Sequence, residues 1–272
     1  MAGKFAESEW MAGTWLAVEA VTGIEKKDLI ARPNLEIQNE KAEKLQSIFD
    51  RMQKEEPIQY ILGESYFRYL KIKVNPAVLI PRQETEWLVD LVLAKVLNSE
   101  AVGVDVCTGS GCIALSLATE RPKWKMSGLD FEENALEVAK ENNVNTKGGV
   151  NFFHDNALNL KHKPQPLSLD FIVSNPPYVP YSQADEVENQ VKMFEPESAV
   201  FVDGDDSILF YKTIFNQYLS GLKNGGWFFF EIHPTSEQLL QDFLSSFLGI
   251  KFWFEKDFKN LTRFLMIQKQ II

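Results

Sequence analysis

A glycine-rich turn joins a short apolar run to a helical pattern in the segment Val102-Gly-Val-Asp-Val-Cys-Thr-Gly-Ser-Gly-Cys-Ile-Ala114. The run from 102 to 106 predicts a strand, and the residues from 113 to about 119 predict a helix. Glycines in such a turn let the backbone adopt positive φ and approach a ligand closely. Ligands of open α/β sheets bind beside the carboxyl ends of parallel strands. The segment therefore predicts a ligand site at this turn.

Strand and helix patterns alternate outward from the turn. The strand candidates are 102–106, 125–130, 150–153, 171–173 and 227–232, and the helix candidates are 113–119, 132–142, 208–222 and 236–247. This alternation predicts a parallel sheet with helices on both faces. The last two strand candidates, 251–254 and 264–268, have no helix between them. They predict a hairpin and hence one antiparallel strand.

The N-terminal part of the chain has a different pattern and predicts separate units. Residues 1–56 are polar, rich in Glu and Lys, and helical in pattern, which predicts a small helical domain. Residues 57–84 alternate loosely around Gly63, which predicts short strands forming a β-hairpin linker. Residues 85–272 form the remaining α/β domain, with Thr85 as the expected cap of its first helix.

The composition is that of an ordinary globular protein. Of 272 residues, 45% are hydrophobic and 24% charged, and the formal net charge is −10. That balance disfavours duplex nucleic acid as a partner. Two cysteines indicate a reducing compartment, and three scattered histidines predict no metal site. With no leader-peptide pattern and no membrane-spanning run, the expected location is the cytoplasm, with no membrane partner.

Acidic residues near the turn bear on the identity of the ligand. Asp130 ends the second strand, about 20 residues after the turn, where a carboxylate can bond both hydroxyls of a ribose. The spacing Gly109-x-Gly111-x-x-Ala114 also fits a nicotinamide dinucleotide. Asp105 beside the turn would repel a pyrophosphate but suits a cation, which favours the sulfonium of S-adenosylmethionine. At the end of the third strand, Asp155-Asn156 could bond the adenine ring.

The most informative turn follows a later strand, in Asp170-Phe-Ile-Val-Ser-Asn-Pro-Pro-Tyr178. Each proline fixes its own φ and pushes the preceding residue toward an extended conformation, so the strand end is stiff. The Asn175 side chain and the carbonyls of Asn175 and Pro176 can accept the two donors of a planar –NH₂ group, while Tyr178 can stack on it. The turn therefore predicts methyl transfer to an amide or aromatic amine nitrogen, with alignment mattering more than a strong base.

Two motifs in this order, Asp-x-x-Thr-Gly-Ser-Gly and Asn-Pro-Pro-Tyr, resemble those of class I S-adenosylmethionine methyltransferases that act on planar amino groups. The segments Pro57–Gly63 and Val74–Glu86 are similar to the PrmC/HemK family, and the resemblance spans nearly the whole chain. It implies a Rossmann-like, seven-stranded α/β sheet, mostly parallel with one antiparallel strand, behind a small helical N-terminal domain.

The same resemblance implies an activity. The family methylates the side-chain amide nitrogen (N5) of the glutamine in the Gly-Gly-Gln motif of class I peptide chain release factors. S-adenosyl-L-methionine is then the cofactor, S-adenosyl-L-homocysteine the product, and a release factor the partner, with no metal and no direct nucleic-acid contact. One active site per chain makes a monomer the expected state.

Family roles fall on particular residues of this sequence. The implied cofactor-binding residues are Cys107, Thr108, Gly109, Ser110, Gly111, Asp130, Asn156 and Asn175. The implied substrate-binding residues are Asn175, Pro176, Pro177 and Tyr178, and the implied catalytic residues are Asn175, Pro176 and Tyr178. Residues that match further family segments, or are expected to order the cavity wall, are Arg82, Glu84, Glu86 and Phe194-Glu195-Pro196.

Three positions depart from the family pattern. Cys107 stands where glycine is usual, so the first turn must tolerate a side chain. Asn156 stands where some members carry an aromatic residue. The segment Glu231-Ile-His-Pro234 replaces the more usual Glu-x-Gly, and His233 is either structural or part of the site.

Three other functions stay open at this point. A glutamine methyltransferase for a ribosomal protein would suit the acidic charge equally well. A nucleic-acid N6-adenine methyltransferase shares the Asn-Pro-Pro-Tyr chemistry, although the sequence shows no basic stripe or large insertion. A degenerate binding module would keep the fold without turnover, and the intact turn at 175–178 argues against it.

Overall fold

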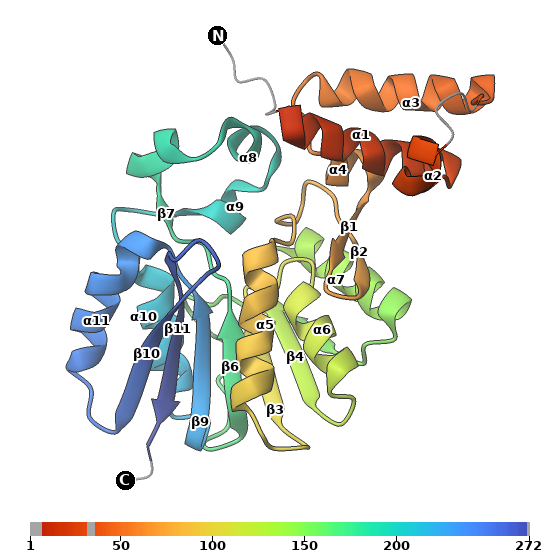
Figure 1. Ribbon diagram of the computed structural model, residues 1–272. Helices are drawn as coiled ribbons and strands as arrows, with labels where there is room; N and C mark the ends of the chain where they lie inside the picture. Colours follow the sequence, from red (N-terminus) through yellow and green to blue (C-terminus); the bar gives the residue numbers. More distant parts are fainter. Residues whose placement is uncertain (1–6, 32–35, 271–272) are drawn as a thin grey trace.

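The computed structural model describes residues 7–31 and 36–270, and a seven-stranded sheet lies at its centre (Figure 1). The strand order is β10-β11-β9-β6-β3-β4-β5. The strands are β3 (Val102–Val106), β4 (Lys125–Asp130), β5 (Asn151–His154), β6 (Leu169–Ser174), β9 (Leu222–Glu231), β10 (Ile250–Lys256) and β11 (Thr262–Lys269). Each strand candidate of the α/β region corresponds to one of these strands.

One strand runs against the others. β11 pairs antiparallel with both β9 and β10, whereas the pairs β3–β4, β3–β6, β4–β5 and β6–β9 are parallel. The expected α/β sheet with one antiparallel strand is therefore confirmed. The chain leaves β3 toward β4 on one side and later returns to β6 on the other. This reversal opens a crevice at the carboxyl ends of β3 and β6, where ligands bind in such sheets.

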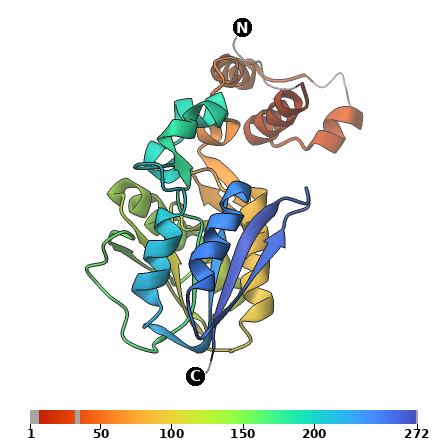
Figure 2. The same ribbon diagram turned by 90° about the vertical axis from the view of Figure 1, so that its left-hand side faces the viewer.

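Helices cover both faces of the sheet (Figures 1 and 2). They are α5 (Gln83–Lys95), α6 (Cys112–Glu120), α7 (Glu133–Thr146), α10 (Leu209–Tyr218) and α11 (Glu237–Ser245), with a short η2 (Pro234–Ser236). One core cluster joins α5, α6 and α7 to the sheet, and a second joins α10 and α11. Because side chains alternate along a strand, Phe229 of β9 enters the first cluster while Phe228 and Phe230 enter the second.

Helices also occupy the N-terminal region, as the sequence pattern predicted. They are α1 (Glu7–Thr22), α2 (Lys26–Ala31), α3 (Asn39–Met52) and α4 (Ile58–Leu62). Buried Ala17 and Val18 of α1 pack with Leu45 of α3 in a small core of their own. Residues 1–6 and 32–35 of this region lie outside the described residues.

The predicted hairpin is present but shorter than expected. It consists of β1 (Glu64–Phe67) and β2 (Leu70–Lys73), which pair antiparallel. Residues 58–62, read from sequence as part of a strand, instead form α4. Pro57 precedes the first helical turn, and Gly63 ends the helix with a φ of 74°, a conformation that glycine adopts without strain. The residues that bound the helix, Pro57 and Gly63, therefore decided its structure, and the loose alternation of apolar and polar residues did not.

Two polar anchors attach the hairpin to the sheet helices. Arg68 at the hairpin turn forms ion pairs with carboxylates of α5 and α6, each over 2.7 Å. Fully buried Asn142 of α7 accepts the backbone N–H of Lys73 over 2.7 Å and donates to the carbonyls of Lys73 and Ser110, each over 3.0 Å. The hairpin and the glycine turn are thus held by one amide side chain.

Between β6 and α10 the chain forms a cap over the carboxyl ends of the strands (Figure 1). Its elements are β7 (Val179–Pro180), η1 (Tyr181–Glu186), α8 (Asn189–Phe194), α9 (Glu197–Val200) and β8 (Phe201–Val202). Gln190 of α8 donates to the carbonyl of Glu55 over 3.0 Å, which connects the cap to the N-terminal helices. These elements are too short to leave a clear periodic pattern in the sequence.

Candidate active site

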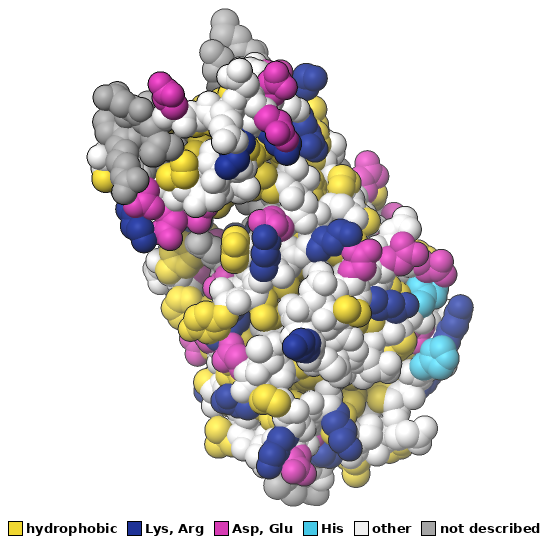
Figure 3. Space-filling view, turned by 90° about the vertical axis from the view of Figure 1, so that its right-hand side faces the viewer, with side chains coloured by type: hydrophobic (Ala, Val, Ile, Leu, Met, Phe, Trp, Pro, Cys, Tyr) yellow, Lys and Arg dark blue, Asp and Glu magenta, His cyan; other side chains and the backbone are white. Residues whose placement is uncertain are grey.

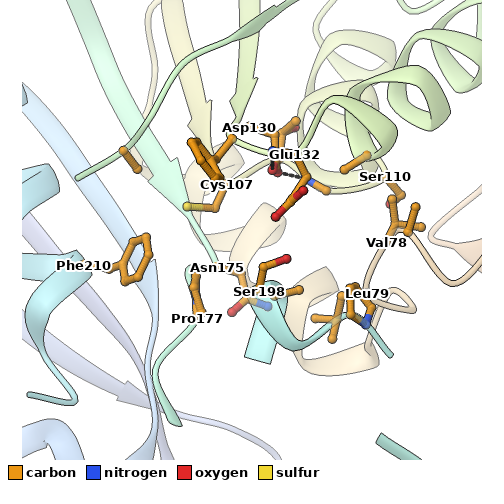
Figure 4. Close-up of a pocket in the computed structure, with 18 of the residues that line it drawn as sticks. Val78, Leu79, Cys107, Ser110, Asp130, Glu132, Asn175, Pro177, Ser198 and Phe210 are labelled. Atoms are coloured by element: carbon orange, nitrogen blue, oxygen red, sulfur yellow. Dashed lines mark hydrogen bonds between the residues drawn. The ribbon is translucent and has the colours of Figure 1, made fainter. Parts of the chain in front are cut away.

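A cavity of about 570 Å³ opens at the carboxyl ends of β3, β4 and β6, beneath the cap (Figure 4). Its wall combines the glycine turn, the end of β4, the strand end at Asn175, and the segment before α5 that contains Val78 and Leu79. Cap residues and Phe210 of α10 close another side. Segments far apart in the sequence therefore meet at the crevice that the sheet reversal predicts.

The glycine turn has an unusual backbone. Cys107, Gly109 and Gly111 all have positive φ, at 61°, 54° and 80°. The turn is closed by the N–H of Gly111, which donates to the carbonyl of Thr108 over 2.8 Å. Cys107 occupies a conformation that glycine adopts far more readily, so the departure noted in the sequence is a strained position. Cys107, Thr108, Gly109 and Ser110 all line the cavity.

Asp105 has a different role from the one expected. Its side chain is fully buried, accepts the Thr108 hydroxyl over 2.6 Å and the Ala114 N–H over 3.3 Å, and is not part of the cavity lining. Burial raises the pKa of Asp105 to about 7. One carboxylate oxygen is buried without a hydrogen-bond partner. Asp105 therefore holds the turn from inside and does not line the cavity.

The cofactor contact expected of Gly111 stays a prediction, and the packing around this glycine gives a second reason for it. Gly111 is absent from the cavity lining, and a Cβ at this position would lie 2.8 Å from the ring of Phe152 and 3.3 Å from Ala139. A side chain would therefore collide with the core. Glycine is required here by the positive φ and by the close packing of α6 against its neighbours.

Asp130 lies on the cavity wall at the end of β4 (Figure 4). One carboxylate oxygen accepts the N–H of Gly109 over 2.8 Å, and the other accepts the N–H of Glu132 over 3.0 Å. Burial raises the pKa of Asp130, and these backbone bonds oppose that effect. The carboxylate therefore links the glycine turn to the neighbouring strand at the position where the sequence predicts ribose contacts.

The third strand contributes one of its two expected polar residues. Asn156 lines the cavity. Asp155 does not, because its buried carboxylate accepts the N–H groups of Asn156, Lys161 and His162 over 2.8 to 3.0 Å. Burial opposes ionisation, but these backbone bonds lower the pKa of Asp155. Asp155 therefore organises the loop, and only Asn156 is placed to meet a ligand.

The Asn-Pro-Pro-Tyr turn divides between the cavity and the interior. Asn175 and Pro177 line the cavity, whereas Pro176 is buried outside its lining. Tyr178 also lies outside the lining, and its ring packs at 5.7 Å from the ring of His233. The stacking of Tyr178 on the substrate stays a prediction, and in this structure the ring contacts His233. His233 has the structural alternative of its two expected roles, as support for Tyr178.

Sequence reasoning missed several residues of the site. Thr85, expected as a helix cap, is the third residue of α5 and lines the cavity, while Arg82 occupies the cap position. Tyr181 and Phe201 stack at 4.9 Å in the cap and also line it. The sequence offered two signals for these residues. One is the apolar run Val78–Ile80 before Pro81, and the other is the pair of aromatic residues in the otherwise polar cap segment. Neither indicates which residues face a cavity.

Arg82 and Glu195 join two walls of the site. The guanidinium of Arg82 forms an ion pair with Glu195, whose other oxygen accepts the N–H of Ile80 over 3.1 Å. Glu195 is buried, so this pair ties the cap to the segment before α5. Of the other two acidic residues expected to order the wall, Glu86 accepts the N–H of Arg68 and Glu84 lies 3.6 Å from Lys259. Arg82 alone of the three lines the cavity.

Two kinds of feature are absent from residues 7–31 and 36–270. In these ranges, no group of three His, Cys, Asp or Glu side chains is arranged to hold a metal ion. Among the helices of the same ranges, none is long and apolar enough to cross a membrane.

The sheet order and the two turns that meet at one cavity, the glycine turn and Asn-Pro-Pro-Tyr, define a class I methyltransferase. Residues 85–204 match the Methyltransferase small domain family, and residues 6–63 match the PrmC N-terminal domain. The release factor glutamine methyltransferase of Flavobacterium psychrophilum is 35% identical over 86% of this chain and 82% of its own. The corresponding protein of Thermodesulfovibrio yellowstonii is 36% identical over 87% and 85%. The chain belongs to the release factor glutamine methyltransferase family.

Solved structures agree at the level of the fold. The hMettl16 catalytic domain, in complex with a MAT2A 3′UTR hairpin, has a TM-score of 0.57 at 16% identity, covering 75% of this chain and 76% of its own. A human methyltransferase 10 domain containing protein has a TM-score of 0.51 at 16% identity, covering 74% and 90%. At such identities these likenesses describe the shared methyltransferase fold alone.

Proposed function

We propose that this protein transfers a methyl group from S-adenosylmethionine to the side-chain amide nitrogen of the Gly-Gly-Gln glutamine in class I peptide chain release factors. The observation that carries the proposal is that Asn175 and the glycine turn line one cavity. In this proposal an acceptor for a flat amide and a cradle for a nucleoside would lie side by side. The names of relatives at 35% and 36% identity supply the substrate.

The residues on the wall fit S-adenosylmethionine. Asp130 would hold the ribose hydroxyls, Asn156 the adenine edge, and the backbone at 107–110 the amino-acid end, where positive φ leaves room for close approach. When bound, the cofactor supplies an electrophilic methyl group. Gly111, Asp105 and Pro176 would support this arrangement from behind the wall.

Asn175 would bind and orient the glutamine amide of the substrate. Its carbonyl oxygen can accept one N–H of a glutamine amide, which fixes the nitrogen at the floor of the cavity. Fixing the nitrogen close to the methyl group and in line with it supplies much of the rate enhancement of a two-substrate reaction. The amide loses a proton only after its nitrogen is alkylated, so no strong base is needed on the wall.

The remaining parts of the chain fit the same scheme. Residues 1–56 would contact the release factor, 57–84 would link the two units, and 85–272 would perform the transfer. Gln190 and Arg82 connect the cap to its surroundings, so substrate binding at the cap and order at the cavity wall would be coupled. With one proposed active site per chain, a cytoplasmic monomer is the simplest working form.

The test is methyl transfer to a purified release factor. The protein is incubated with methyl-labelled S-adenosylmethionine and a class I release factor, and the labelled residue is located by mass spectrometry. We expect one methyl group on the Gly-Gly-Gln glutamine. A release factor in which that glutamine is replaced by glutamate serves as the matched control and should stay unlabelled. Absence of label on the native factor would refute the proposal.

Parallel reactions separate the other substrates. Ribosomal proteins and adenine-containing duplex DNA are offered under the same conditions. On the face in Figure 3, basic and acidic side chains are interspersed, unlike the continuous basic stripe that duplex binding favours. If a ribosomal protein or DNA were labelled in preference to the release factor, that substrate would be the physiological target.

A further inference from the structure

Three side chains form a chain of hydrogen bonds behind the substrate position. The hydroxyl of Thr85 donates to a carboxylate oxygen of Glu231 over 2.7 Å, and both side chains are buried. The side-chain –NH₂ of Asn175 donates to the same Thr85 oxygen over 3.3 Å. Thr85 comes from α5, Glu231 from the end of β9, and Asn175 from the end of β6.

The direction of these bonds follows when Glu231 is ionised. An ionised carboxylate can only accept, so the single hydroxyl proton of Thr85 is committed to Glu231. The Thr85 oxygen can then only accept from Asn175, which must turn its –NH₂ group toward Thr85. The two ends of an amide have nearly the same shape, and their hydrogen-bond partners decide which end points where. The carbonyl oxygen of Asn175 is therefore left for the cavity.

We propose that Thr85 and Glu231 are positioning residues that hold the carbonyl oxygen of Asn175 toward the substrate and so select a glutamine amide over a glutamate carboxylate. This inference rests on the proposed function and deepens it. A glutamine –NH₂ meets an acceptor, whereas a carboxylate in the same place meets oxygen against oxygen. Selectivity then comes from repulsion of the wrong group as well as attraction of the right one.

The surroundings of Glu231 set the pH above which its carboxylate can only accept. Burial raises the pKa of Glu231 to about 7, while the Thr85 bond and the charges of Arg263 on β11 and Arg82 before α5 lower it, and Glu84 raises it. Above that pH the carboxylate is ionised and can only accept. The hydroxyl of Thr85 is thereby oriented toward Glu231 at pH values above about 7.

The test compares two peptides on two variants. One peptide contains Gly-Gly-Gln and the other Gly-Gly-Glu, and binding to protein carrying S-adenosylhomocysteine is measured by calorimetry. We expect the wild type to prefer the glutamine peptide by about tenfold or more, because an unpaired or repelled polar group is rejected strongly. Thr85→Ser keeps the hydroxyl and should keep that preference. Thr85→Val frees the Asn175 amide to rotate, so the preference should shrink to about threefold or less.

A role in packing alone would weaken both peptides by the same factor and leave their ratio unchanged. An unchanged ratio in Thr85→Val would therefore overturn the inference. Thermal melting reports whether Thr85→Val folds, and Thr85→Ala, which leaves space for a water, replaces it if it does not. Wild-type methyl transfer to the glutamine peptide is measured separately. Failure there removes the proposed function and this inference with it, whereas transfer with an unchanged ratio removes the inference alone.

Discussion

At the scale of single residues, the site depends on which way a few polar side chains face. Asn175 faces the cavity and Tyr178 does not, although both belong to one four-residue turn. Asp130 lies on the cavity wall, while the carboxylate of Asp105 accepts its hydrogen bonds from inside the glycine turn. We therefore expect ligand binding and methyl transfer to depend on side chains that present a hydrogen-bond acceptor to the cavity.

Asn175→Ala tests the acceptor directly. Loss of the Asn175 amide should lower kcat/KM for release-factor methylation by about 100-fold or more, as for other preorganised hydrogen-bond groups. Affinity for S-adenosylmethionine, measured by calorimetry, should change little. Asn216→Ala on the exposed face of α10 is the matched control and should behave as wild type. A near-normal transfer rate in Asn175→Ala would contradict the acceptor role.

At the scale of elements, the turns are shaped by what packs behind them. Gly111 and Gly225 have nearly the same φ, at 80° and 82°, but different surroundings. A Cβ on Gly111 would lie 2.8 Å from Phe152, whereas nothing lies within 4 Å of the Cβ position at Gly225. The hairpin and the glycine turn in turn depend on Asn142.

Alanine at these two glycines separates backbone strain from collision. Gly225→Ala should lower the free energy of unfolding by about 1 kcal/mol, the cost of positive φ alone. Gly111→Ala should lower it by about 2–4 kcal/mol, because overpacking against Phe152 adds to the same strain. Urea denaturation measures both. Equal losses would show that the core near Phe152 gives way easily.

Asn142→Ala should loosen two elements at once. The substitution leaves the backbone N–H of Lys73 and two carbonyls without partners, and we expect the free energy of unfolding to fall by about 2–4 kcal/mol. Amide hydrogen exchange should quicken in β2 and in the glycine turn, more than in β10 and β11. Asn216→Ala should stay within about 0.5 kcal/mol of wild type. If amide exchange in Asn142→Ala quickened equally in all of these segments, Asn142 would not be a local anchor.

At the scale of the whole molecule, burying two carboxyl groups beneath the cavity links stability to pH. Burial raises the pKa of both Asp105 and Glu231 to about 7. Their unfolded values lie near 4, so the folded protein binds more protons between about pH 4 and 7. The stabilisation that this gives is complete below the unfolded values and is lost as pH rises through about 7.

The melting temperature without cofactor should therefore be higher at pH 5.5 than at pH 8. Asp105→Asn removes one of the two groups and should make that dependence shallower. Asp242→Asn on the exposed side of α11 should leave it unchanged. Calorimetric scans across this range provide the measurement. A melting temperature that rises with pH in the wild type, or a slope unaltered in Asp105→Asn, would count against these two groups.

Local pattern was sufficient for the elements of the α/β sheet. The glycine turn, the carboxylate at the end of β4 and the Asn-Pro-Pro-Tyr turn were all readable, because each depends on residues close together in the chain. The cap was not readable, since its helices are short and held by contacts such as Gln190 with Glu55. Residues 58–62 were misread because alternation alone does not distinguish a short helix from a short strand.

The sequence by itself therefore determined the sheet, the order of the two functional turns and the family. The tertiary structure decided which residues of those turns reach the cavity, and it alone brought Thr85 to Asn175 across 90 residues and to Glu231 across 146. The physical reason is range. Turn and strand preferences arise between near neighbours in the chain. A hydrogen-bonded trio from α5, β6 and β9 exists only after the strands have paired and α5 has packed against the sheet.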